Sequence, residues 1–197
     1  MLIGAVVRPL LGRWMGPWLD RWEAALQLKR VSLYFDLSDK RCEVSDDAHH
    51  VYRVGVLNRT GKPLNPVWVK VVKTWPQDAA GSPRPLQEKD DVVDANLEFA
   101  ASKAGVQVNP TTETPNRFFN VVEKFYKDIP VPQFTGERRY KDHVYVSVAS
   151  GVDRHSPVVI PDDRIREITL RLDTPFGSVD KDFSVKVVNG RLFFKPA

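Results

Sequence analysis

Alternation of apolar and polar residues constrains this chain more than any other feature of its sequence. It begins after Arg30 and continues to the C-terminus. In Pro66–Trp75, for example, three valines two residues apart alternate with Trp68 and Lys70. Successive side chains of a strand point to opposite faces of a sheet, so this pattern predicts a strand with one buried face. Other clear strands are expected at Val31–Leu37, His50–Leu57, Asp142–Ala149 and Glu167–Asp173.

The strongest local prediction is a hairpin at the C-terminal end. Two alternating runs, Asp182–Val188 and Arg191–Lys195, are separated by Asn189 and Gly190 alone. Both central residues of a type I′ turn need a positive φ angle, which asparagine and glycine adopt at the lowest cost. We therefore expect a two-residue turn at this position.

Residues 31–197 are expected to form one all-β domain, an antiparallel immunoglobulin-like β-sandwich of about seven to nine strands. Short strands without helices between them can bury their apolar faces when two sheets pack face to face. Two segments, 76–94 and 126–139, contain several proline and glycine residues and are expected to be long loops. The preceding segment, residues 1–30, has a different pattern and is treated as a separate helical element.

Residues 52–71 resemble part of a known family. The segment Tyr52-Arg-Val-Gly-Val-Leu-Asn-Arg-Thr-Gly-Lys-Pro-Leu-Asn-Pro-Val-Trp-Val-Lys-Val71 is an alternating strand that ends in Asn, passes a Gly-containing turn and returns as Val-x-Val-x-Val. It is similar to the B–C hairpin of bacterial immunoglobulin-like domains, in particular those of the CARDB-like type. The resemblance implies a sandwich fold, and those domains serve adhesion or assembly.

Residues 2–29 show helical periodicity. On a helical wheel an apolar stripe lies on one side, and Asp20 and Glu23 lie on the other. The stripe consists of Ile3, Val7, Leu10, Leu11, Trp14, Met15, Trp18, Trp22 and Ala25. Pro17 is expected to kink or break this amphipathic helix, so two pieces, 2–15 and 18–29, and one helix are both open.

The tryptophans of this stripe, four residues apart, leave three alternatives. The stripe packs on the chain's own sandwich, lies in a membrane interface, or docks on a partner or a second copy. Indole rings favour the headgroup layer of a membrane, and Trp and Arg are also typical of binding hot spots. The side chains expected to make a partner or membrane contact are Arg8, Leu10, Leu11, Trp14, Trp18, Arg21 and Trp22.

The distribution of charge limits the partners. Residues 1–30 hold five basic and two acidic side chains, and so carry +3 of the chain's net charge of +4. The nearly neutral body is not expected to bind nucleic acid, whereas the basic helix suits an anionic membrane. The single cysteine, Cys42, fits a reducing compartment. The apolar core of an export signal has no charge, whereas Arg8 and Arg13 interrupt the first apolar run of this chain. The expected location is cytoplasmic, with membrane association as an option.

One group of residues has the composition of a chemical site. The residues are Asp46, Asp47, His49 and His50 before one strand, and Asp153 and His155 in a later segment. If the two segments met, their carboxylates and imidazoles could bind a transition metal. Their spacing matches no known ligand set, so we expect no metal site. The sequence has no nucleophile elbow and no phosphate-binding glycine loop, so neither a catalytic residue nor a cofactor is expected.

The sequence therefore favours a non-enzymatic protein–protein interaction or assembly module. Its contacts are expected through the Trp- and Arg-rich helix and through loops 76–94 and 126–139. A peripheral membrane protein held by the same helix is the alternative. A metal-dependent enzyme that uses the His and Asp segments is a distant third.

Overall fold

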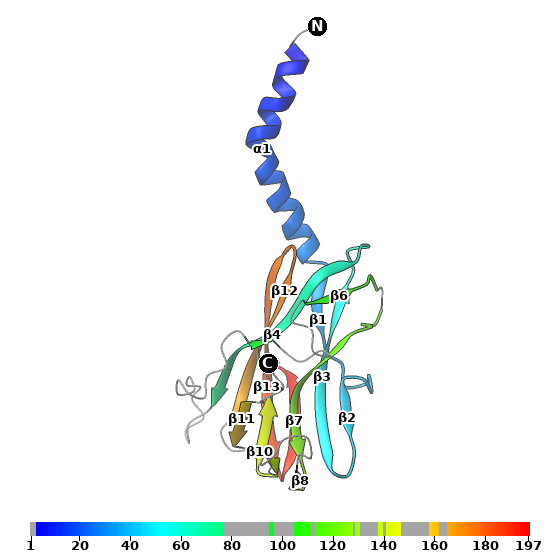
Figure 1. Cartoon of the computed structure of the whole chain (residues 1–197), viewed down its shortest axis with the longest axis vertical. Coiled ribbons are helices and arrows are strands. Elements are labelled where there is room, and N and C mark those ends of the chain that lie inside the picture. The colour runs from blue at the N-terminus through cyan, green and yellow to red at the C-terminus, as the bar shows by residue number, and fades with distance from the viewer. Residues whose placement is uncertain are drawn as a thin grey trace.

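The fold is a two-sheet β body with one helix at its end (Figure 1). The structure, a computed structural model, describes residues 3–76, 95–96, 105–111, 113–127, 129–130, 138–139, 141–146, 158–161 and 165–197. Helix α1 (Ile3–Leu28) is followed, in this described part, by strands alone. All strand pairs recorded there are antiparallel.

Two sheets enclose the core. The strands are β1 (Val31–Tyr34), β2 (Glu43–Ser45), β3 (His49–Asn58), β4 (Leu64–Pro76), β5 (Ala95–Asn96), β6 (Val106–Val108), β7 (Phe118–Phe125), β8 (Ile129–Pro130), β9 (Arg138–Arg139), β10 (His143–Val146), β11 (Val158–Pro161), β12 (Ile165–Thr174), β13 (Gly177–Val188) and β14 (Arg191–Pro196). The first sheet has the order β1-β3-β7-β10-β11, with β2 also paired to β3. The second has the order β14-β13-β12-β4-β5, with β6 also paired to β4, while β8 and β9 pair with each other.

Valine-rich alternation builds the core between the two sheets. The three valines of the alternating run in β4 are fully buried, whereas Trp68 and Lys70 between them are half-buried on the other face. β-branched side chains pack well on a pleated sheet surface, which explains why valine dominates. Larger rings from the second sheet complete the core, where Phe183 and Phe194 stack with their centroids 4.7 Å apart.

The predicted all-β sandwich fold is confirmed, and so is its C-terminal hairpin. Asn189 and Gly190 have φ angles of 52° and 76°, and they join β13 to β14 with Val188 paired to Arg191. The part of 31–188 that the structure describes contains no helix. The period-two pattern was therefore a reliable guide to the layers of this protein.

The number and length of the strands differ from the prediction. The described residues contain fourteen strand segments instead of seven to nine. Several of the additional ones, such as β2, β8 and β9, have two or three residues, too few to show an alternation. Strand β13 begins at Gly177 instead of Asp182, because its pairing with β12 continues as far as Thr174.

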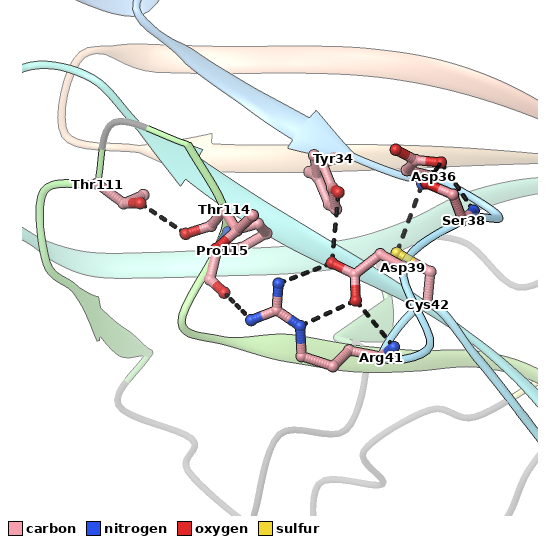
Figure 2. A network of polar contacts seen from close by, with 9 residues as sticks. All are labelled: Tyr34, Asp36, Ser38, Asp39, Arg41, Cys42, Thr111, Thr114 and Pro115. Atoms are coloured by element: carbon pink, nitrogen blue, oxygen red, sulfur yellow. Dashed lines mark hydrogen bonds and ion pairs between the residues drawn. The ribbon is translucent and has the colours of Figure 1, made fainter.

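A polar clamp fastens two loops to the first sheet (Figure 2). Asp39 accepts hydrogen bonds from Arg41, with Nε–Oδ1 at 2.9 Å and Nη2–Oδ2 at 2.7 Å, and from the Tyr34 hydroxyl. Arg41 also donates to the Pro115 carbonyl and lies over the ring of Phe118, 4.9 Å from its centroid. The guanidinium hydrogen bonds lower the pKa of Asp39 to about 2. These groups satisfy one another, which indicates a structural role.

The single cysteine belongs to the same region. Cys42 is fully buried, and its sulfur accepts a hydrogen bond from the backbone N–H of Asp36 at 3.5 Å. Burial raises the pKa of the thiol, which disfavours the reactive thiolate. Cys42 therefore has the surroundings of a structural thiol.

Candidate functional site

Helix α1 extends away from the sandwich instead of lying across one of its sheets (Figure 1). Its main contacts are with β13 and β1, at the end of the body where the helix is attached. The side chain of Leu28, in the last helical turn, lies against Gly177, where an added Cβ would be 3.4 Å from Leu28 Cδ2. The helix is therefore attached at its C-terminal end, and no element of the described part of the chain covers most of its length.

The tryptophans of the helix are exposed where their side chains are described. Trp18 is 63% exposed and Trp22 is 58% exposed, and Leu19 and Leu26 are also exposed. The first of the three alternatives, that the stripe packs on the sandwich as core, is therefore wrong for Trp18 and Trp22. Arg21, which we expected in the same contact surface, is exposed as well.

The remaining predicted contact residues lie in the first half of the helix. The backbone of this half is helical and runs without a break into the second half. The side chains in question, those of Arg8, Leu10, Leu11 and Trp14, lie outside the described part of the structure. The helical backbone is continuous from Ile3 to Leu28, which favours one helix over two separate pieces. The ribbon of this helix bends near its middle (Figure 1).

The composition of this helix is unfavourable for a helix that stands alone in water. It includes Pro9 and Pro17, each costing about 3 kcal/mol relative to alanine in a helix interior, and Gly12 and Gly16, each costing about 1 kcal/mol. Most of the stability of a helix in a protein comes from packing of its apolar face. A surface that covers the apolar stripe would therefore also stabilise the helical conformation.

A rigid turn lies beside the attachment point of the helix. The backbone N–H of Arg59 donates to the carbonyl of Arg30 at 2.9 Å, which ties the β3–β4 turn to the end of the helix. Asn58 organises this turn, since its buried amide Nδ2 donates to the carbonyls of Lys62 (2.8 Å) and Val108 (3.0 Å). Gly61, at φ 81°, adopts the left-handed conformation that the turn requires.

A polar cleft of about 800 Å³ lies at the opposite end of the sandwich, between the β2–β3 and β13–β14 hairpins. His50 lies in its wall, with Nε2 2.9 Å from Glu43 Oε1 and Nδ1 2.9 Å from the Tyr126 hydroxyl. The Tyr52 hydroxyl shares its single proton between Glu43 Oε1 at 3.4 Å and the Leu192 carbonyl at 3.3 Å. The cleft thus has a chain of hydrogen bonds that joins the two sheets.

Burial controls protonation along this chain. It lowers the pKa of His50, against the opposing effect of the Glu43 carboxylate, and so favours the neutral imidazole. Nε2 then carries the proton that Glu43 accepts, and Nδ1 accepts the proton of Tyr126. Burial also raises the pKa of Tyr52 and of Tyr126. Since both imidazole nitrogens have partners, this geometry supports a structural role better than general base catalysis.

Three of the predicted candidates for a metal site, Asp46, Asp47 and His50, line the polar cleft. His49 lies on the other side of β3 from His50, pairs with Glu123 at 3.0 Å and stacks on Phe125. Asp46 caps the turn before β3 by accepting from the backbone N–H groups of Ala48 and His49. No group of three or more potential metal ligands occurs among the described residues. Asp153 and His155 lie outside that part of the chain.

The two predicted contact loops are only partly described. Most of segment 76–94 lies outside the described residues. Segment 126–139 contains β8 and β9, which pair through Ile129 with Arg139 and Pro130 with Arg138, so it is not wholly a loop. Each of these two strands has two residues, too few for an alternating pattern to predict them.

Comparison with protein-family models, with curated proteins and with solved structures finds no match. The likeness of residues 52–71 to CARDB-like domains therefore stays a prediction. Within the described residues, no helix is both long enough and apolar enough to cross a membrane.

Sequence reasoning missed the junction between helix and sandwich. The Gly-containing turn after Asn58 is visible in the sequence, but its position beside Arg30 depends on the pairing of β1 with β3. In that register Val31 pairs with Asn58, so the residues before one and after the other become neighbours. The alternating pattern predicts both strands, but it does not predict that they pair with each other in this register.

Proposed function

We propose that this chain is a non-enzymatic attachment module, in which helix α1 lies in the interfacial layer of a lipid bilayer and holds the sandwich at the membrane surface. One observation carries the proposal. Trp18 and Trp22 are more than half exposed on a helix that extends away from the body. Contiguous apolar surface of this kind marks an interaction site in a soluble protein.

The pattern of the helix favours a lipid interface as the occupant. On a helical wheel, Arg8 and Arg21 flank the tryptophan stripe, and the acidic residues lie on the far side. Such an arrangement lets indole rings enter the headgroup layer while the arginine side chains reach lipid phosphates. Partition into the bilayer interface would also favour the helical conformation, because backbone groups without hydrogen bonds are costly in contact with lipid, and this would offset the low helix propensity of the glycine residues.

A protein partner or a second copy of the chain is the competing occupant. Trp and Arg are frequent in binding hot spots, and that composition led us to expect a protein contact first. A coiled-coil seam needs apolar residues at alternating spacings of four and three. Part of the stripe has that spacing, namely Leu11, Met15, Trp18, Trp22 and Ala25. The support for the lipid occupant is therefore the arginine residues beside the tryptophans, and the oligomeric state without lipid tests for a second copy.

Flotation of the full chain with phospholipid vesicles tests the proposal. The wild-type protein should float with vesicles, and Trp18→Ala/Trp22→Ala should lower the partition coefficient at least about a hundredfold, given the area of two indole rings. Phe193→Ala is the matched control, since Phe193 is an aromatic side chain 50% exposed at the opposite end of the sandwich. The control should bind like wild type.

Two results would count against the proposal. Vesicle binding that is indifferent to the tryptophan substitutions would show that the helix is not the attachment element. A stable dimer in the absence of lipid, lost in Trp18→Ala/Trp22→Ala and accompanied by no vesicle binding, would identify a second copy as the occupant.

A further inference from the structure

Four basic side chains gather where the helix joins the sandwich. Lys29 and Arg30 end the helical segment, and Arg59 and Lys62 belong to the β3–β4 turn, which the Arg59–Arg30 backbone hydrogen bond holds beside them. All four are exposed. We call them the basic collar. Residues 26–31 and 58–64, which form this junction, include no acidic residue.

The backbone turn that carries Arg59 and Lys62 is held in place before any ligand binds. The Asn58 side chain donates to the Lys62 carbonyl, and its Oδ1 accepts from the backbone N–H and the hydroxyl of Thr60 at 3.1 and 2.7 Å. Since Asn58 is fully buried, the turn that carries Arg59 and Lys62 is anchored in the body. A preorganised set of cations loses less conformational entropy on binding an anion than a mobile one does.

Several cations elsewhere on the described surface have acidic partners, in contrast to the collar. Arg41 pairs with Asp39 at 2.7 Å, Lys70 with Asp173 at 2.8 Å, and Arg171 with Asp180 at 2.7 Å. No ion pair is recorded for the four collar residues within the described part of the chain. Their charge is therefore available to an external anion.

We infer that the basic collar binds the phosphate groups of anionic lipids, so that the helix-bearing end of the sandwich faces the membrane. This inference rests on the proposed function and adds the lipid class that the site selects. The collar is continuous with the helix, so the aromatic stripe and the collar can meet one bilayer surface together. The stripe supplies apolar contact, and the collar supplies a preference for negative charge.

The experiment compares the partition of the full chain onto vesicles of phosphatidylcholine alone and of phosphatidylcholine with phosphatidylglycerol. The test variant is Arg59→Glu/Lys62→Glu. The matched control is Lys186→Glu/Lys195→Glu, which alters two exposed lysines on β13 and β14. Each double variant replaces two positive charges with two negative ones, so both change the net charge from +4 to zero.

Wild type should prefer the anionic vesicles. Arg59→Glu/Lys62→Glu should lower the anionic partition coefficient by about 30-fold or more, since each cation near such a surface contributes about fivefold. Its binding to neutral vesicles should not change, and the control should lose much less. Arg59→Gln/Lys62→Gln provides a second variant in case charge reversal disturbs folding, and Arg59→Lys should bind like wild type.

Each remaining outcome overturns the inference in a distinct way. Equal losses in the two double variants would show that net charge matters and the collar does not. Equal binding of wild type to neutral and anionic vesicles would leave the helix proposal standing and refute the collar. Failure of wild type to bind either vesicle would refute both. Binding of a nucleic acid duplex with the same dependence on Arg59 and Lys62 would assign the collar to another polyanion.

Discussion

Deletion of residues 1–28 should leave the sandwich folded and nearly as stable as the full chain. The deletion retains Lys29 and Arg30, and with them the backbone hydrogen bond from Arg59 to Arg30. What it removes from the body is chiefly the half-buried Leu28 against Gly177. Full burial of a leucine contributes about 1.5–3 kcal/mol, so partial burial implies a loss below about 2 kcal/mol in the free energy of unfolding.

If the helix packed on the sandwich instead, its deletion would cause a much larger loss in the free energy of unfolding. If all three tryptophans of the stripe packed as core, their burial would contribute on the order of 15 kcal/mol before entropic losses. Urea unfolding followed by the emission of Trp68 and Trp75, which both proteins retain, distinguishes the two cases. The dependence of the unfolding free energy on urea should also stay the same, because the helix is already exposed. A loss above about 5 kcal/mol, or an insoluble truncated protein, would refute this reasoning.

Three further predictions concern the sandwich itself. Asn58→Ala should lower the free energy of unfolding by about 2–4 kcal/mol, because it leaves the Lys62 and Val108 carbonyls without their donor; urea unfolding with the exposed Asn109→Ala as control checks this. Tyr126→Phe should cost about 1 kcal/mol by removing the hydrogen bond to His50 and should leave vesicle binding unchanged, whereas a large loss of vesicle binding would contradict a structural role for that cleft. The pKa of Asp39 in the folded state is about 2 instead of 3.8, so the contribution of Asp39 to stability is present above about pH 4 and is lost as the pH falls toward 2. Asp39→Asn should therefore reduce the acid dependence of the free energy of unfolding, and an unchanged pH profile would refute this.

The alternating strands were predictable because their pattern and their burial have the same cause. A strand with one face in the core must alternate, so β4 and the hairpin of β13 and β14 were visible in the sequence. Strand β3 departs from this rule, since Val51 on the side opposite the core is also buried. Its outer face lies against other parts of the chain, and no local pattern predicts which segment will cover a sheet.

The position of the helix could not be predicted from its own periodicity. An amphipathic stripe shows that one face seeks an apolar surface, and it does not identify that surface. The register of β1 with β3 and the turn of β12 to β13 place the end of the helix at the end of the sandwich, so that Trp18 and Trp22 extend past it. The basic collar depends on the same register, because Arg30 and Arg59 are distant in the sequence.

Hydrogen–deuterium exchange of the amides of helix α1, with and without anionic vesicles, tests the central claim most directly. In water the amides of this exposed, proline-containing helix should exchange rapidly, whereas those of β4 and β12 in the core sheet should be protected. Anionic vesicles should slow exchange across the helix by at least about tenfold and leave the strands unchanged. Protection of the helix that is already strong in water, or that does not change when vesicles are added, would contradict its role as a membrane attachment element.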